Sequence, residues 1–401
     1  MSIQSPKSPV SLISYAHADG HESVDVLAQE LRLRGIRVVR DIQSFRAGRA
    51  LDGEMRDATD ADLVVGHLGP AALESTAVMK QELGPALHGH LRHERPVVVL
   101  VPHGIGADRA EVDATIAGRL PYSHQATWAL APEPTGTPLT ATFAANAARA
   151  SLASLYGVGR GLADGRWSIL LLTRGIPRHG DGLVIDATEL VGGATRRPGC
   201  ASNWTRIKAA IGDLALTLGR HGSRRAITLT SNAHSTAGVL AGHAFNRAAG
   251  WDLNVISPAG TSTPSGRRAL DGISEVSIDG PPDDRRLFVG IDLAGRGVAA
   301  AIDDLCAIEG GRPGHELLYE RTDAATDMTA AQMADAAAAI GTAIKSAVDG
   351  YHPERIDLFI AAPAPVAVLL GSELATLGLP IVLWEHRDSH YVHAVDVRHG
   401  A

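Results

Sequence analysis

The feature that most constrains this 401-residue chain is the alternation of short apolar runs with amphipathic segments. Apolar runs that predict strands occupy residues 10–16, 36–41, 62–68 and 95–102. Residues 23–35 and 75–87, which lie between such runs, carry apolar side chains at helical spacing. This βαβα order predicts an α/β fold with a parallel sheet and helices on both faces. In such a sheet, the active site lies beyond the carboxyl ends of the strands.

The second part of the chain contains an internal repeat. Residues 209–242 align without a gap on residues 338–371, and ten of the 34 pairs are identical. Upstream, the apolar strands 167–175 and 287–295 also match. Each half is therefore predicted to run as strand, long loop, helix, strand, helix, strand. Two related halves in one chain predict a pseudo-dimer with a cleft at its seam.

Charge and composition exclude several classes of protein. The chain carries 37 basic and 44 acidic residues, so long DNA or RNA is not expected as its main ligand. Two cysteines are too few for a disulfide framework or a thiolate zinc site. No apolar stretch approaches the ~20 residues that span a bilayer, and no signal peptide is visible. A globular cytoplasmic protein without a membrane partner is expected.

One stretch departs from this negative balance. Residues 160–208 contain seven arginines and one lysine against four acidic residues. Arginine pairs well with phosphate oxygens, so a small anionic ligand is compatible with this stretch.

The N-terminal part of the chain resembles a TIR domain (Toll/interleukin-1 receptor). The resemblance covers about the first 125 residues. It rests on the start Ile13–Asp19, the strand Gly35–Asp41, the loop Ile42–Leu51 with its aromatic and arginine residues, and Glu82 after Ser75. It implies a flavodoxin-like parallel sheet.

In TIR domains that cleave NAD+, a glutamate on the helix after the third strand is catalytic, and Glu82 matches that position. A carboxylate beside the ribose would stabilise the positive charge that develops when nicotinamide leaves. The residues expected to bind NAD+ are Ser14, Tyr15, His17, Asp41, Phe45 and Arg49. Alternatively, Glu82 and Arg49 are solvated charges, Phe45 anchors a loop and Asp41 caps a turn. The sequence also departs from the family, because Val78 replaces a frequent aromatic residue and Gly69 replaces a frequent serine.

The duplicated part resembles a SAVED domain, which is a fusion of two units similar to CARF domains. The motifs that carry this resemblance are 227–242, 356–371 and 287–295. SAVED domains are sensors fused to effectors in bacterial CBASS antiphage systems, and CARF domains bind cyclic oligoadenylates. The resemblance therefore implies two Rossmann-like α/β units with a cyclic oligonucleotide as activator.

Polar turns after the strands of this part predict the ligand site. Arginines would bind phosphates, while asparagine, histidine and tryptophan would contact bases. The predicted ligand-binding residues are Arg174, Arg178, Arg196, Arg197, Asn203, Trp204, Asn232, His234, Arg296, Trp384 and Arg387. For any one of them, the alternative is a solvated charge or a core aromatic. The histidines at 386, 390 and 393 lie in a strand-rich segment, so no metal site is predicted.

The predicted organisation is a TIR domain at 1–128, a linker and helix at 129–150, and a SAVED domain at 151–401. The two CARF-like halves would span approximately 151–280 and 281–401. The predicted function is a NAD+ glycohydrolase that a cyclic oligonucleotide, such as cyclic tri-adenylate, activates by driving homo-oligomer or filament formation. NAD+ is the substrate, and no prosthetic group is expected. The alternatives are a non-catalytic TIR scaffold that assembles on a cyclic nucleotide, and an ungated nucleoside hydrolase.

Overall fold

The computed structural model of the protein describes residues 8–19, 21–40, 61–91, 97–105, 109–120, 123–129, 139–157, 166–175, 182–191, 200–222, 224–266, 268–322, 327–387 and 390–398. The chain divides into two compact units. The first comprises Met1–Asp164 with the short segments His179–Ile185 and Leu216–Ser223, and the second comprises the rest.

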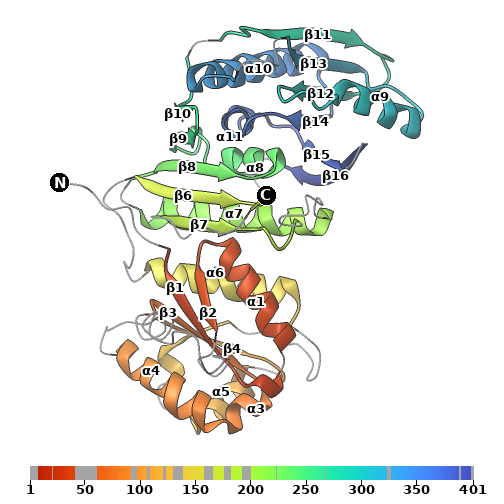
Figure 1. Ribbon diagram of the computed structural model, residues 1–401. Coiled ribbons are helices and arrows are strands. Elements are labelled where there is room, and N and C mark those ends of the chain that lie inside the picture. The colour runs from red at the N-terminus through yellow and green to blue at the C-terminus, as the bar shows by residue number, and fades with distance from the viewer. Residues whose placement is uncertain are drawn as a thin grey trace, which may run out of the picture. The chain divides into compact units, whose positions relative to one another are not determined.

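The first unit contains a five-stranded parallel sheet in the order β2-β1-β3-β4-β5 (Figure 1). Its strands are β1 (Val10–Ser14), β2 (Arg37–Arg40), β3 (Leu63–Leu68), β4 (Val97–Pro102) and β5 (Thr127–Trp128). Every residue of β1, β3 and β4 is buried, as expected where helices cover both faces of a parallel sheet. The predicted parallel sheet is confirmed.

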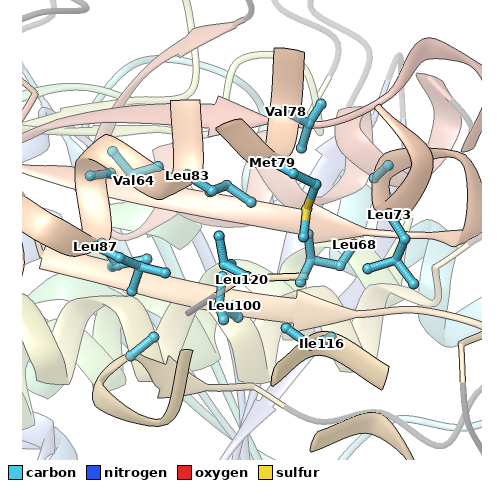
Figure 2. Packing of buried hydrophobic residues seen from close by; sticks show 14 of the residues in the cluster. Val64, Leu68, Leu73, Val78, Met79, Leu83, Leu87, Leu100, Ile116 and Leu120 are labelled. Atoms are coloured by element: carbon cyan, nitrogen blue, oxygen red, sulfur yellow. The ribbon is translucent and has the colours of Figure 1, made fainter. Parts of the chain in front are cut away.

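Helices on the two faces complete the first unit. On one face, α1 (His21–Leu33) packs against α6 (Ala141–Gly157). On the other, a core cluster joins β3 and β4 to α3 (Pro70–Glu74), η3 (Ala77–Leu83), α4 (Gly84–Leu91) and α5 (Arg109–Ala117). Figure 2 shows Met79 and Leu83 of this cluster on the same side of the sheet as Leu68 and Leu100. The apolar stripe predicted for 23–35 is confirmed, because Val24, Leu27 and Leu31 are fully buried in α1.

One predicted helix has a different form. Residues 75–87 were expected to be a single helix, but the π-helix η3 spans Ala77–Leu83 and runs directly into α4. The sequence prediction missed it because a π-turn adds one residue per turn without changing the apolar character of the buried face.

Two further sheets belong mainly to the second unit, although most of β7 and the end of α7 fall in the short segments counted with the first unit. The first has the strand order β10-β9-β8-β6-β7, and β8 lies parallel to both β6 and β9. Its strands are β6 (Trp167–Leu172), β7 (Leu183–Asp186), β8 (Ala226–Asn232), β9 (Asp252–Ser257) and β10 (Gly260–Ser262), and its helices are α7 (Ala201–His221) and α8 (Ser235–Ala244).

The second sheet of this unit has six strands in the order β11-β13-β12-β14-β15-β16. Its parallel centre is flanked by antiparallel partners at both edges. The strands are β11 (Ile273–Asp279), β12 (Arg286–Asp292), β13 (His315–Arg321), β14 (Arg355–Ala361), β15 (Ile381–Arg387) and β16 (His390–Val397), and the helices are α9 (Val298–Glu309), α10 (Ala330–Tyr351) and α11 (Ala364–Leu374).

The predicted repeat is confirmed, because α7, β8 and α8 correspond to α10, β14 and α11. The long loop predicted after the strand at 287–295 is wrong. Helix α9 and strand β13 occupy that part of the chain. The buried face of α9 consists of Val298, Ala301, Ile302, Leu305 and Cys306, and the alanines around them weaken the amphipathic spacing on which the prediction relied.

Helices α8 and α11 join the two halves with almost no space between their backbones. A Cβ atom on Gly242 would lie 1.8 Å from the carbonyl oxygen of Val368, and one on Gly371 would lie 2.2 Å from that of Val239. Gly242 and Gly371 are equivalent positions of the repeat, as are Val239 and Val368. The seam therefore repeats the same contact twice, and glycine is required at both positions because any side chain would meet backbone.

No helix in the described part of the chain is long and apolar enough to cross a membrane.

Candidate functional site

The carboxyl ends of the strands in the first unit bring Ser14 and Glu82 together. Ser14 ends β1 and is fully buried, and its hydroxyl donates a hydrogen bond to Glu82 Oε2 at 2.5 Å. Glu82 lies on η3 and is partly exposed. The predicted catalytic residue and one predicted substrate-binding residue are thus in direct contact, at the edge where such folds bind ligands.

The π-helix explains how Glu82 reaches the end of β1. Its neighbour Leu83 is fully buried against Gly66 of β3, where a Cβ atom would lie 2.9 Å from Leu83 Cδ2. Because Gly66 has no side chain, η3 approaches the sheet closely and carries the Glu82 carboxylate to Ser14. Val78, which replaces the aromatic residue frequent in TIR domains, is buried in the core cluster.

The position of Asp19 explains why Gly69 stands where many TIR domains have a serine. Its carboxylate accepts hydrogen bonds from the backbone N–H groups of Ala71 at 2.8 Å and Ala72 at 2.5 Å, at the start of α3. A Cβ atom on Gly69 would lie 2.4 Å from Asp19 Cγ. The aspartate therefore occupies the space that a serine side chain at position 69 would need. The sequence prediction missed this pairing because 50 residues separate the two positions.

The other predicted NAD+-binding residues of this unit have different environments. His17 is exposed, and its Nδ1 lies 3.1 Å from His21 Nε2. Tyr15 is 3% exposed, and its ring packs against the rings of His17 and His21. Asp41, Phe45 and Arg49 lie outside the described residues.

A pair of buried histidines was not predicted. His67 of β3 and His103, which follows β4, have ring centroids 5.3 Å apart. Burial, together with the neighbouring His103, lowers the pKa of His67 to about 4. His67 is therefore neutral at physiological pH.

In the second unit, the end of β6 is tied to the end of β8. The N–H groups of Thr173 and Arg174 both donate to the carbonyl of Asn232 at 3.2 Å. The Asn232 side chain donates back to the carbonyl of Arg174 at 3.1 Å. The Thr173 hydroxyl lies 2.7 Å from His234 Nδ1 and also accepts the His234 backbone N–H. Three predicted ligand residues, Arg174, Asn232 and His234, are thereby held together.

Trp204 and Asn203 support this cluster from α7. Trp204 is fully buried, and its ring meets the His234 ring edge-on at 6.0 Å. The Asn203 amide donates to the carbonyl of Leu190 at 2.7 Å. Burial and the nearby Arg174 lower the pKa of His234 to about 4. Trp204 therefore holds His234 in place from the core, and His234 is neutral at physiological pH.

A buried carboxylate from the second half reaches the same cluster. Glu385 of β15 is 6% exposed and accepts a hydrogen bond from the hydroxyl of Thr236, which is fully buried in the first turn of α8. Burial raises the pKa of Glu385 to about 7, although the Thr236 hydrogen bond and Arg174 oppose the shift. The sequence analysis did not select Glu385 or Thr236, which lie 149 residues apart.

Three of the remaining predicted ligand residues, Arg296, Trp384 and Arg387, belong to strands of the second sheet or to the turns that follow them. The Asp292 carboxylate accepts the backbone N–H groups of residues 296, 297 and 298 at 2.7–3.2 Å, which places exposed Arg296 in a fixed turn. Trp384 donates its indole N–H to buried Asp357 at 2.9 Å and stacks on Phe359. Arg387 is exposed at the end of β15. Arg178, Arg196 and Arg197 lie outside the described residues.

The strand prediction for the histidine-containing segment is confirmed, because β15 and β16 pair antiparallel there. Within the described ranges, no group of three or more His, Cys, Asp or Glu side chains is placed to hold a metal ion.

Comparison with protein families identifies both parts of the chain. The family model described as TIR domain matches residues 12–125. The model described as SMODS-associated and fused to various effectors sensor domain (SAVED) matches residues 211–397. No curated protein matches the chain.

Solved structures with the same fold include the Cap4 SAVED/CARF-domain containing receptor of Acinetobacter baumannii with the cyclic trinucleotide 3'3'3'-cAAA. It is 13% identical, with a TM-score of 0.50, and the match covers 94% of this chain and 97% of that one. The same receptor with 2'3'3'-cAAA gives a TM-score of 0.49, with the same identity and coverage. The Cap4 receptor of Moraxella osloensis gives 0.44 at 13% identity, covering 85% of this chain and 83% of that one. At this identity, the similarity to the first structure shows the α/β fold alone.

Proposed function

We propose that this chain, which carries a TIR domain followed by a SAVED domain, is a NAD+ glycohydrolase switched on by a cyclic oligonucleotide. The observation that carries the proposal is the contact between Ser14 and Glu82 at the carboxyl edge of the TIR sheet. The biological role would be depletion of NAD+ during antiphage defence.

The chemistry requires little more than a positioned carboxylate. The nicotinamide of NAD+ is already cationic, so the leaving group needs no proton. As the N-glycosidic bond breaks, positive charge develops on the ribose, and the Glu82 carboxylate would stabilise it. The Ser14 hydroxyl would fix the direction of that carboxylate, since a hydrogen bond to a charged acceptor is stronger than one between neutral groups.

The sensing half would bind its ligand where the strands of both SAVED sheets end. Arg174, Asn232 and His234 are held there by mutual hydrogen bonds, and exposed Arg174 offers its guanidinium to a phosphate. A cyclic tri-adenylate or a similar cyclic oligonucleotide is the proposed activator. A receptor with the same fold has been solved with such a trinucleotide.

Activation would proceed through assembly. A ligand that adds contacts between protomers raises the local concentration of TIR domains. Neighbouring TIR domains would then complete one another's active sites, and a head-to-tail contact that does not close would extend into a filament.

The second candidate is a TIR scaffold that assembles on the same ligand without catalysis. The position of Val78 favours it, because this aliphatic side chain is buried in the core where many TIR domains have an aromatic residue. The Ser14–Glu82 contact favours the enzyme.

Cleavage of a fluorescent NAD+ analogue by the full chain, with a panel of cyclic di-, tri- and tetranucleotides, separates these candidates. We expect cleavage with one ligand class and none without ligand. Cleavage without any ligand would overturn the gating. Ligand-driven assembly measured by light scattering, with no cleavage across the whole panel, would favour the scaffold.

A further inference from the structure

Three polar side chains at the outer edge of the six-stranded sheet are arranged as a serine–histidine–aspartate triad. Ser277 and Asp279 lie on β11, and His315 lies opposite Asp279 on β13. His315 Nδ1 lies 3.0 Å from Asp279 Oδ1, and His315 Nε2 lies 3.3 Å from the Ser277 hydroxyl. Each ring nitrogen therefore faces the partner that nucleophilic catalysis by a serine requires.

The positions of the protons follow from the chemistry of these groups. An ionised aspartate only accepts hydrogen bonds, so Nδ1 of the neutral His315 ring carries the hydrogen that lies between it and Asp279. Nε2 is then the acceptor, and the Ser277 hydroxyl donates to it. This is the tautomer in which a histidine can remove the proton of the serine.

Tyr351, the last residue of α10, holds both the histidine and the aspartate. Its ring stacks on the His315 ring, with centroids 3.6 Å apart and an interplanar angle of 21°. Its hydroxyl donates to Asp279 Oδ1 at 3.0 Å. His315 is 3% exposed, so the base is fixed by packing. Because Tyr351 already orients the base and the carboxylate, the Ser277 hydrogen bond is not needed to hold these two side chains.

Ser277 is exposed, whereas the base behind it is buried. β11 ends the strand order of its sheet, so its outer side meets no other strand among the described residues (Figure 1). Opposed residues of an antiparallel pair alternate between bonded and non-bonded positions, and Gly280 donates its N–H to the carbonyl of Gly314 opposite. Ser277, three residues before Gly280, falls on a non-bonded position, so its N–H points away from β13. An N–H beside the nucleophile can donate to the oxyanion that forms when a carbonyl is attacked.

We propose that Ser277, His315 and Asp279 form a second catalytic site, which hydrolyses carboxylic esters through an acyl-serine intermediate. Ser277 Oγ attacks the carbonyl carbon as its proton passes to His315 Nε2. The bond to the alcohol oxygen then breaks, and His315 gives that proton to the departing alcohol. A water molecule repeats both steps, releases the carboxylic acid and restores the serine. The reaction needs no co-reactant except water, and it does not depend on the NAD+ or cyclic-oligonucleotide chemistry proposed above.

The test is covalent labelling of the full chain with a fluorophosphonate probe, followed by mass spectrometry of its peptides. Attack by Ser277 forms an Oγ–P bond and expels fluoride, whereas a serine without a base reacts far more slowly. We expect about one adduct per chain, on Ser277. Hydrolysis of 4-nitrophenyl acetate is the second readout and should begin with a burst of about one 4-nitrophenolate per chain.

Three positions identify the groups. Ser277→Ala should lose both the adduct and the burst. His315→Gln should slow labelling at least about a hundredfold, because the general base is lost. Asp279→Asn should slow it at least about tenfold, and Asp279→Glu should recover part of the rate because it restores the carboxylate. Asp279 is exposed, so its variants keep the test valid if replacement of buried His315 prevents folding.

The controls address other serines and the background cleavage of the ester by the 18 histidines of the chain. Ser274→Ala is matched to Ser277→Ala, because Ser274 lies on the same strand and donates to the carbonyl of Glu320 instead. His352→Asn changes an exposed histidine. Both variants should be labelled and should cleave the ester as the wild type does.

No adduct on Ser277, or labelling of Ser277 at the wild-type rate in His315→Gln or Asp279→Asn, would overturn this inference. Either result would leave the proposed function intact.

Discussion

Each unit of the molecule contains a glutamate that accepts a hydrogen bond from a hydroxyl at the ligand edge of a sheet, yet the two pairs differ in burial. Glu82 in the TIR domain is partly exposed beside Ser14, whereas Glu385 in the SAVED domain is 6% exposed beside Thr236. The first carboxylate can meet a substrate directly. The second has a pKa raised to about 7, so it exchanges a proton near neutral pH. Burial, rather than residue type, therefore distinguishes the two carboxylates.

The largest expected effect comes from removing the exposed carboxylate. Glu82→Gln should lower ligand-activated NAD+ cleavage at least about a hundredfold, because the charge that stabilises the ribose is lost while the shape is kept. Initial rates of fluorescent NAD+ analogue cleavage give the measurement.

The matched control is Glu74→Gln, which changes an exposed glutamate on α3. It should retain full activity, and both variants should bind the cyclic oligonucleotide as the wild type does. Normal cleavage rates in Glu82→Gln would show that Glu82 is not needed for the reaction. The two glutamate–hydroxyl pairs would then not differ in function in the way described above.

The second largest expected effect is on the pH dependence of the free energy of unfolding, which Glu385 should change. The pKa of Glu385 rises from 4.5 to about 7 on folding, so the folded protein binds more protons than the unfolded chain between these values. The stabilising contribution of this group is present below pH 4.5 and is lost as pH rises through 7. Between pH 5 and pH 8, wild type should lose roughly 2–3 kcal/mol of stability relative to Glu385→Gln.

Urea unfolding followed by tryptophan fluorescence measures this difference, because Trp167, Trp204, Trp251 and Trp384 all belong to the second unit. Equal pH dependence in the two proteins would show that Glu385 keeps an ordinary pKa. The two carboxylates would then differ in exposure only.

The smallest expected effect is at the hydroxyl of the Ser14–Glu82 pair. Ser14→Ala should lower kcat about tenfold with little change in KM, because the Glu82 carboxylate loses the donor that orients it. Ser11→Ala on the same strand is the control. The Ser11 hydroxyl is buried and has no hydrogen-bond partner in the described part of the chain, so its loss should leave kcat unchanged. A shift in KM alone would assign Ser14 to substrate binding rather than to orientation of Glu82.

Local sequence patterns predicted the elements of the fold, because burial of strands and helix faces follows spacing along the chain. The first four strands of the TIR sheet and the equivalence of α8 with α11 were predicted in this way, whereas the short strand β5 was not. Glu82 was predicted from a family resemblance, and its contact with Ser14 across 68 residues came only from the fold.

Contacts between residues far apart in the sequence could not be predicted, because no local spacing pattern indicates them. Thr236 and Glu385 were not predicted, since nothing in either segment indicates that one donates to the other. The hydrogen bond from the Trp384 indole N–H to buried Asp357 was not predicted either, and the contact of Trp384 with a base stays a prediction. The contributions of Asp41, Phe45 and Arg49 remain predictions.

The reciprocal contact of Gly242 with Val368 and of Gly371 with Val239 has a consequence for how the ligand edge can evolve. In a symmetric homodimer, any substitution appears on both sides of the axis at once. Here the two copies share one chain, so each can change alone while the glycine contacts hold the halves in register. Thr236 and its counterpart Pro365 show such a divergence. A cyclic ligand with identical nucleotides would therefore meet two non-identical surfaces, and the described residues place Glu385, with its pKa of about 7, on one of them.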